Sequence, residues 1–403
     1  MINQNESNTK KTSFWKIVWN ILATFGIVYL VISIFLGIFY KANFYELIEI
    51  SNLIKFNSIY QDKFTPENIF TGLYRGIASS TGDYYTYYLT PAEWKEKTAS
   101  FQGEGYAGIG VTVTEEENGF LLVTRVNKKG VAIEAGIKPG DSITAIEGID
   151  VRTLGLDGAV EKMRGLVDTK VTIKVMNGTT KKIAEKTMVR KELIAESVVY
   201  KTLTLPEGVI AYIQINGFNY TTPIEMKAAF AEIEKTSYAG IVLDLRANGG
   251  GLLESVLDVA GYFLPEGPLF YEKLNGKEVV YKTDKSGTEK PMMVLIDGGT
   301  ASAAEVLAGA IQDKKKGLLI GEQSYGKGIV QSNMPLSNGG GLSVTIAEYL
   351  TPNRRNIHKI GLTPDIKLEM ETLARIKAIN FAPDLENDLQ LRRAILELNK
   401  LIN

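Results

Sequence analysis

The chain has 403 residues, with 45 Lys and Arg against 46 Asp and Glu, one histidine and no cysteine. The lack of cysteine excludes disulfide scaffolds, thiolate zinc sites and enzymes with a cysteine nucleophile, and the single His358 excludes a multi-histidine metal centre. A formal net charge of −1 without a long basic run argues against nucleic acid as a partner. Any catalysis must therefore come from hydroxyls, carboxylates, lysines or backbone amides.

The first segment predicts a membrane anchor. Residues 17–40 are 24 consecutive residues without a charge, and as a helix they would reach about 36 Å, more than the hydrocarbon layer of about 30 Å. Lysines precede this segment more often than they follow it, so residues 1–16 are expected to stay in the cytoplasm and the rest outside it, at the cell membrane. The alternative is a cleaved signal peptide, whose apolar region is usually shorter, about 7–15 residues. We expect a retained anchor.

Residues 41–98 predict a small helical region. Thr65 followed by Pro66 is typical of a capped helix start. The tyrosine-rich segment at 83–88 suggests either a binding surface or packing, and packing is the commoner use of clustered aromatic side chains. We therefore expect it to pack.

Residues 99–190 change to short strands and tight turns. The turn Ala135–Asp141 leads into an apolar strand at Ser142–Ile146. This run resembles the A-G-(I/L)-K-x-G-D-x-I signature of a PDZ domain, with 156–164 as the main helix. The segment Lys128–Ala132 departs from the usual G-S-P-A-type turn, which implies a modified loop.

The PDZ resemblance implies peptide recognition. Such domains add an extended peptide to a sheet edge while backbone amides bind its terminal carboxylate, so protein or peptide substrates with free C-termini are the expected partners. Gly108, Ile109 and Gly110 would form the amide loop, since glycine allows a close approach of backbone to ligand. The alternative is that these glycines only shape a turn.

Residues 191–370 alternate between strand and helix patterns, which indicates an α/β core. The strands are expected at 209–215, 241–245, 292–296 and 318–320, and the helices at 224–233, 252–263 and 301–311. A closing segment, 371–403, is expected to be helical.

One glycine-rich segment suggests a nucleotide site. Gly321–Gly328 contains G-x-x-x-x-G-K after a predicted strand. A phosphate loop needs Ser or Thr after the lysine and a helix beyond it, whereas Gly328 and a strand pattern follow here. A nucleotide-binding function is therefore only an alternative.

The residues favour a serine nucleophile with a lysine base. Ser302 lies at a predicted strand-to-helix junction among small residues, where a hydroxyl can stand exposed, although a helix cap is the commoner role there. Lys327 can act as a base if burial lowers its pKa. Gln331 shares a strand face with Lys327, but their Cβ atoms would be about 13 Å apart in an extended strand. Their contact therefore requires a bend near Gly328.

Ser302, Lys327 and Gln331 resemble the Ser/Lys/Gln constellation of the carboxyl-terminal processing peptidases, also called tail-specific proteases. The surrounding T-A-S-A-A-E and G-x-x-S-Y-G-K-G-x-V-Q motifs agree, as do later markers that include Asp388-Leu389-Gln390. The resemblance implies an α/β (α+β multidomain) fold, with an anchor, a helical region, a PDZ domain and a core of the crotonase/ClpP-like type. It also implies a serine endopeptidase that needs no metal or cofactor. Assembly into a homo-oligomer is compatible with the resemblance.

By the same resemblance, the amides of Ala303 and Gly250 would form the oxyanion hole. The family usually has N-P-G-G in this loop, and Gly249 replaces the proline here, so the loop is expected to be looser. Arg164 matches a PDZ arginine that links peptide binding to catalytic alignment in some relatives, although a helix-end arginine facing a dipole is an adequate alternative. The alternative function is a PDZ scaffold with an inert protease core.

Overall fold

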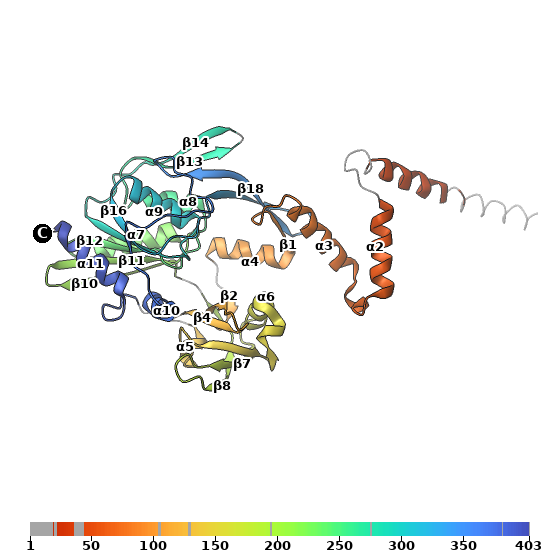
Figure 1. Ribbon diagram of the computed structural model, residues 1–403, viewed down its shortest axis with the longest axis horizontal. Coiled ribbons are helices and arrows are strands. Elements are labelled where there is room, and N and C mark those ends of the chain that lie inside the picture. The colour runs from red at the N-terminus through yellow and green to blue at the C-terminus, as the bar shows by residue number, and fades with distance from the viewer. Residues whose placement is uncertain are drawn as a thin grey trace, which may run out of the picture. The chain divides into compact units, whose positions relative to one another are not determined.

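The protein is described by a computed structural model, which covers residues 19, 22–35, 44–103, 106–127, 130–193, 196–274, 276–380 and 382–402. The chain forms two compact units, Met1–Ser80 and Thr81–Asn403. Figure 1 labels the helices and strands of both.

The first unit is helical where it is described. Its elements are a helix over residues 22–35, α2 (Phe44–Asn57), a 3-10 helix (Gln61–Lys63) and α3 (Pro66–Ser79). The predicted start of α3 is confirmed, because Thr65 Oγ1 accepts a hydrogen bond from the Asn68 N–H at 3.3 Å and Pro66 occupies the first turn. Proline fits there because its missing N–H would have no partner in the helix.

The predicted anchor at 17–40 lies only partly within the described residues. Residues 22–35 are helical, whereas 17–18, 20–21 and 36–40 lie outside the described part of the chain. Among the residues that the structure describes, no helix combines the length and apolar character needed to span a membrane. The anchor therefore stays a prediction.

A small antiparallel sheet and two helices form the PDZ domain region. The strand order is β3-β4-β5-β7-β8, with β6 paired to β5. The strands are β3 (Val111–Glu115), β4 (Leu121–Val126), β5 (Ser142–Ile146), β6 (Ile149–Asp150), β7 (Lys170–Met176) and β8 (Ile183–Val189), and the helices are α5 (Val131–Glu134) and α6 (Val151–Met163). The predicted strand β5 is confirmed. Helix α6 begins earlier than predicted because Asp150 caps an extra turn before a break at Gly155, where φ is 66°.

A mostly parallel six-stranded sheet carries the α/β core. Its order is β10-β11-β12-β15-β16-β19, and all neighbours are parallel except β10 and β11. The strands are β10 (Val198–Leu205), β11 (Gly208–Ile215), β12 (Tyr238–Asp244), β15 (Met292–Ile296), β16 (Gly317–Gly321) and β19 (Ile366–Lys367). The predicted α/β alternation is confirmed, and β15 has the predicted bounds.

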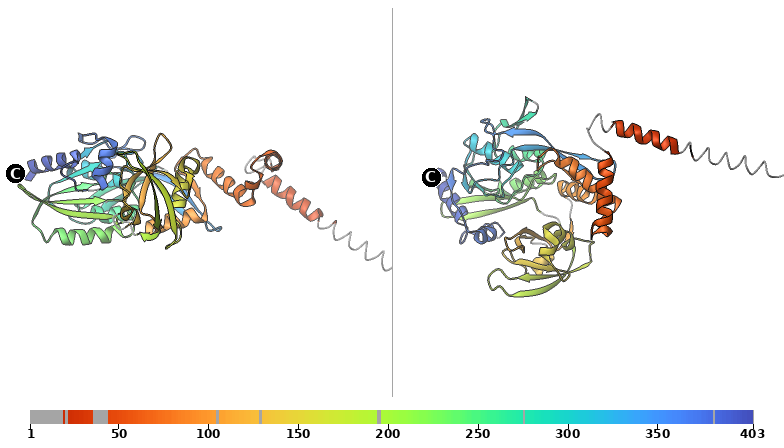
Figure 2. Two further views of the ribbon diagram at one scale, coloured as in Figure 1. Left: turned by 90° about the horizontal axis from the view of Figure 1, so that it is seen from below. Right: turned by 45° about the vertical axis from the view of Figure 1, so that its right-hand side comes forward.

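Helices cover both faces of this sheet. On one face lie α7 (Thr222–Ile233), α8 (Leu253–Ala260) and α9 (Ala303–Asp313), and on the other lies α11 (Leu389–Ile402). Figure 2 shows α7 and α11 on opposite sides of the strands. Because both faces are buried there, central strands such as β12 and β15 are nearly continuous apolar runs rather than alternating ones. Helix α8 ends three residues before its predicted end at Phe263.

A second sheet supports the segment that bears Lys327. Its order is β1-β18-β13-β14, with β17 paired to β18, and β2 and β9 form a separate pair. The strands are β1 (Tyr87–Leu89), β2 (Tyr106–Gly108), β9 (Lys191–Leu193), β13 (Gly267–Leu274), β14 (Lys277–Thr283), β17 (Ile329–Pro335) and β18 (Gly341–Leu350). Helix α4 (Pro91–Gln102) follows β1, and α10 (Thr372–Asn380) precedes α11. Of this sheet, the sequence pattern predicted only the start of β17.

Candidate active site

Ser302 lies at the turn between β15 and α9, as predicted. Its dihedral angles are φ 56° and ψ −120°, a conformation that residues with a Cβ rarely adopt and that costs about 1–3 kcal/mol. Three hydrogen bonds hold its backbone. The Ser302 N–H donates to Glu305 Oε2 at 2.9 Å, and the Ser302 carbonyl accepts from the Tyr349 hydroxyl at 3.2 Å and from the Val306 N–H at 3.0 Å. Sharp turns of this kind present a nucleophilic hydroxyl at the end of a strand.

The predicted oxyanion residues lie against this turn. A Cβ added at Gly250 would be 2.8 Å from Ser302 Cβ and 2.9 Å from the Ala303 nitrogen, so only glycine permits this approach. The Ala303 N–H opens helix α9, where the first amides have no partner within the helix. The Gly250 N–H, in contrast, donates to Asn248 Oδ1 at 2.9 Å. Ala303 therefore offers an open donor in this structure, whereas the Gly250 amide is engaged.

Two glycines bring Lys327 close to another segment. A Cβ at Gly326 would lie 2.8 Å from the Gly361 nitrogen, and one at Gly328 would lie 2.7 Å from the His358 nitrogen. The backbone approaches are therefore so close that only glycine fits at both positions. His358 itself lies near the site, with its ring centroid 6.1 Å from that of Tyr85 and its Nδ1 buried without a hydrogen-bond partner.

Lys327 and Gln331 are in direct contact. Lys327 Nζ donates to Gln331 Oε1 at 2.5 Å, while Gln331 Nε2 donates to the Tyr85 carbonyl at 2.6 Å and to Ser343 Oγ at 2.9 Å. The required bend arises because Lys327 precedes β17, and because the pairing of β17 with β18 shifts register between Val330 and Gln331. Lys327 and Gln331 therefore meet because the chain departs from a regular extended strand between them.

The tyrosine-rich segment has more than a packing role, which corrects the sequence interpretation. Tyr88 is buried as expected, but Tyr84 is 87% exposed. Tyr85 lies beneath the amine, with Lys327 Nζ 5.0 Å from its ring centroid. Spacing could not reveal this contact, because Tyr85 and Lys327 are brought together only by the pairing of β1 with β18.

The surroundings of Lys327 favour the neutral amine. Burial lowers the pKa of Lys327 below its ordinary value, the positive charge of Lys97 lowers this pKa further, and the carboxylate of Asp83 opposes the effect. No hydrogen bond joins Lys327 Nζ to Ser302 Oγ, both of which are described. Catalytic hydrogen bonds often form only when substrate is bound.

Glu305 is the glutamate of the T-A-S-A-A-E motif, and its role becomes visible only in the structure. Its side chain is completely buried. Oε2 accepts from the Ser302 and Lys327 N–H groups, each at 2.9 Å, and Oε1 accepts from Ser324 Oγ at 2.6 Å and the Gly326 N–H at 2.7 Å. One carboxylate therefore connects the backbone of the serine with that of the lysine.

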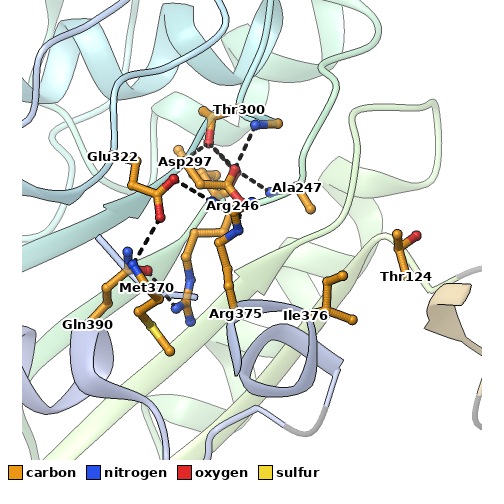
Figure 3. Close-up of polar contacts among 12 residues, drawn as sticks. Thr124, Arg246, Ala247, Asp297, Thr300, Glu322, Met370, Arg375, Ile376 and Gln390 are labelled. Carbon is orange, nitrogen blue, oxygen red and sulfur yellow. Dashed lines mark hydrogen bonds and ion pairs between the residues drawn. The ribbon is translucent and has the colours of Figure 1, made fainter. Parts of the chain in front are cut away.

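A second carboxylate, Asp297, orders the loops before Ser302. Its Oδ1 accepts from the Ala247 N–H at 2.8 Å and the Gly299 N–H at 2.9 Å. Figure 3 shows Arg375 of α10 reaching both Asp297 and Glu322. Asp297 therefore links the glycine loop after β12 to the serine turn.

The predicted peptide-binding residues lie at one end of the PDZ sheet. Gly108 ends β2, and Ile109 and Gly110 form the turn into β3, where the Ile109 side chain is buried. Within the described residues, β3 pairs with β4 on one edge only. Arg164 caps the end of α6 and forms an ion pair with Glu96 of α4.

The glycine-rich segment 321–328 leads into a strand, β17, and not into a helix. Helix N-termini supply the dipole and the open amides that bind phosphate. The segment therefore lacks the structure that would support a nucleotide site.

The fold and the site define a serine-type peptidase core joined to a PDZ domain. Peptidase family S41 matches residues 209–368, and the PDZ domain matches residues 98–176. The chain belongs to the carboxyl-terminal-processing proteases of family S41, which confirms the family that the sequence motifs suggested.

The similarity extends over most of the chain. It is 36% identical to the carboxyl-terminal-processing protease of Synechocystis sp. over 293 residues, which are 69% of this chain and 68% of that protein. It is 32% identical to the carboxy-terminal processing protease CtpA of Bacillus subtilis over 322 residues, 79% of this chain and 68% of that protein.

Solved structures share the fold. The photosystem II D1 C-terminal processing protease has a TM-score of 0.56 and 28% identity, with 86% of this chain and 90% of that chain covered. An S41 protease from Bacteroides fragilis has a TM-score of 0.60 at 14% identity, covering 87% of this chain and 97% of that chain, and shows the fold alone.

Proposed function

We propose that this serine-type protease works by a Ser302–Lys327 dyad in which Gln331 orients the lysine amine. The observation that carries the proposal is the hydrogen bond from Lys327 Nζ to Gln331 Oε1 at 2.5 Å, in surroundings that lower the pKa of Lys327. An uncharged amine that donates one proton to Gln331 keeps its lone pair for the serine hydroxyl.

In this mechanism Ser302 Oγ attacks the peptide carbonyl carbon while Lys327 Nζ takes the hydroxyl proton. The Ala303 N–H stabilises the developing oxyanion, and the Gly250 N–H joins it once it leaves Asn248 Oδ1. Lys327 then returns the proton to the leaving amine. A water molecule, activated by the same lysine, hydrolyses the acyl-enzyme ester.

The PDZ domain is proposed to bind the C-terminus of an unfolded protein or peptide substrate. Support comes from β3, whose second edge carries no partner strand among the described residues, because an extended peptide can add to such an edge. Gly108, Ile109 and Gly110 would then bind the carboxylate, and Arg164 would respond to the bound peptide.

We also propose that residues 17–40 anchor the protease in the cell membrane, with the catalytic domain outside the cytoplasm. The uncharged length of this segment and the lysines before it support the proposal. A fractionation of cells expressing the full chain, followed by protease treatment of intact cells, tests both parts. Self-association stays a prediction, which sedimentation of the purified full chain would check.

Cleavage of an unfolded protein by the wild type, Ser302→Ala and Lys327→Ala tests the dyad. We expect both variants to lose activity by at least about 1000-fold, because each removes a group that participates in the chemical step. Lys327→Arg should fail as well, since a guanidinium stays protonated near neutral pH. Equal cleavage by all variants would show that the dyad is wrong, and an inactive wild type that still binds C-terminal peptides would favour the inert scaffold.

A further inference from the structure

Lys97 lies on α4, far from Lys327 in sequence, and touches the same hydrogen-bond network. Its Nζ donates to the Tyr87 hydroxyl at 2.9 Å and to Ser343 Oγ at 3.3 Å. It also lies 5.0 Å from the centroid of the Tyr87 ring. Lys97 is therefore linked to Lys327 through two side chains, because Ser343 Oγ binds Gln331 and Gln331 binds Lys327.

The hydroxyl of Ser343 takes part in three hydrogen bonds, and its chemistry determines which partner donates in each. A serine hydroxyl has one proton to donate, and Ser343 gives it to Asn333 Oδ1 at 3.0 Å. Its oxygen can then only accept, from Lys97 Nζ and from Gln331 Nε2. Because Ser343 is completely buried, water does not compete for these positions.

This direction determines how Gln331 faces the base. Its Nε2 is bound by two acceptors, Ser343 Oγ and the Tyr85 carbonyl, so its Oε1 must point to Lys327. A flipped amide would place an NH₂ group against the amine and a carbonyl oxygen against the Tyr85 carbonyl. The ammonium of Lys97, which can only donate, helps to keep Ser343 as an acceptor and thus excludes the flip.

We propose that Lys97 is a positioning residue of the peptidase: it holds Ser343 and Gln331 in the orientation that presents an acceptor to Lys327. The positive charge of Lys97 also acts on that base. The inference rests on the proposed Ser302–Lys327 dyad. It places a functional residue in α4, outside the S41 match at 209–368 and before the PDZ match at 98–176.

The charge effect has a definite sign. The ammonium of Lys97 acts in the same direction as burial and lowers the pKa of Lys327, whereas Asp83 raises it. A base must be deprotonated to act, so the activity rises with pH through the pKa of Lys327. The other titratable groups around this cluster are Tyr85, Tyr87, Glu305, Tyr325 and His358.

The test is the pH dependence of kcat/KM for Lys97→Met, Lys97→Gln and Lys97→Arg in the full chain. The ascending limb is the pH range in which kcat/KM rises as Lys327 loses its proton. With Lys97→Met and Lys97→Gln, this limb should move to higher pH by about half a unit to one unit. On that limb kcat/KM falls about three- to tenfold and recovers at higher pH. Lys97→Arg keeps the charge and the donors, so its limb should coincide with that of the wild type.

Two further variants separate the effect of the Lys97 charge from that of its hydrogen bond to Ser343. Ser343→Ala keeps the charge of Lys97 but removes the acceptor, so kcat should fall without movement of the limb. Lys95→Met, at an exposed position on the same helix, is the matched control and should leave the profile unchanged. A purely structural role of Lys97 would lower activity equally at every pH.

An unmoved limb in both Lys97→Met and Lys97→Gln would overturn the inference. The dyad is tested separately, because an active Lys327→Ala variant would refute the base itself. If Lys327→Ala is inactive and the limb of Lys97→Met is unmoved, only the role of Lys97 is wrong.

Discussion

Three N–H groups and one hydroxyl converge on the carboxylate of Glu305, and they come from the segments that bear Ser302 and Lys327. The Ser302 and Lys327 N–H groups share Oε2, while Ser324 and Gly326 donate to Oε1. A carboxylate can accept all four because it has two oxygens and no proton when ionised. At the scale of single residues, this group ties the backbone of Ser302 to that of Lys327.

Glu305→Gln is expected to separate the two segments. A glutamine keeps one acceptor oxygen and turns an NH₂ group toward two buried donors, at a cost of about 1–3 kcal/mol for each unpaired donor. We expect kcat to fall about 10- to 100-fold, with a smaller change in KM, because positioning rather than substrate binding is lost. Steady-state kinetics on an unfolded protein measure both constants.

Glu254→Gln, in the exposed first turn of α8, is the control and should behave as the wild type does. A Glu305→Gln variant with wild-type kcat would show that the carboxylate does not position the dyad.

The sequence could identify Ser302, Lys327 and Gln331 as candidates because their motifs are local and their residue types suit the chemistry. Lys97 and Tyr85 could not be predicted in the same way, since their contacts with Ser343 and Gln331 each span 246 positions. The engaged state of the Gly250 amide was also beyond the sequence, because it depends on the rotamer of Asn248.

At the scale of elements, α10 contacts both the PDZ domain and the serine loops. Near its middle, Arg375 lies 3.8 Å from Asp297 Oδ2 and forms an ion pair with Glu322. At its end, Asn380 Oδ1 accepts from the Val126 N–H of β4 at 3.3 Å, and Asn380 Nδ2 donates to the Thr124 carbonyl. The helix therefore joins a strand of the PDZ sheet to the carboxylate that orders the Ser302 turn.

Asn380→Ala should loosen this junction without touching the catalytic residues. We expect a several-fold loss of kcat/KM for long substrates with a free C-terminus, which need the PDZ domain held in place, and little change for a short amidated peptide. The ratio of the two specificity constants measures the effect. Glu371→Gln, at the exposed position before α10, is the control, and an unchanged ratio in Asn380→Ala would contradict the role of the helix.

Continuous apolar runs such as β15 were predicted because burial on both faces leaves a local pattern. The second sheet was largely missed for the opposite reason. Strand β1 has three residues, two of them tyrosines, and acquires its strand conformation only by pairing with β18, as in Leu89 with Gly341. Short edge strands carry no periodicity that could distinguish them from a loop.

At the scale of the whole molecule, Arg246 connects the middle of the chain to its last helix. Its guanidinium is fully buried and bonds the carboxylates of Asp244 and Asp388 and the amide oxygen of Gln390. The sequence identified Asp388 and Gln390 as family markers, but only the fold shows that they pair with a residue more than a hundred positions earlier.

Arg246→Met should destabilise the entire second unit. It leaves two buried carboxylates without a cation, and breaking such a cluster costs about 3–5 kcal/mol. A lower Tm in thermal denaturation, for the peptidase core as one transition, is the expected result. Arg393→Met on the exposed side of α11 removes only a surface ion pair with Glu397 and should leave the Tm within about a degree or two of the wild type. Similar Tm values for the two variants would refute this role of Arg246.

The pairing of β1 with β18 has a consequence for the order in which the chain is made. A ribosome releases β1, α4 and the whole PDZ domain before it reaches β18, and it releases Asp388 later still. The PDZ sheet can therefore fold on the emerging chain, whereas the contact between Gln331 and Tyr85 forms only after the chain has folded back on its own beginning. A growing chain thus completes its PDZ sheet while the partners of the proposed Ser302–Lys327 site are still being made.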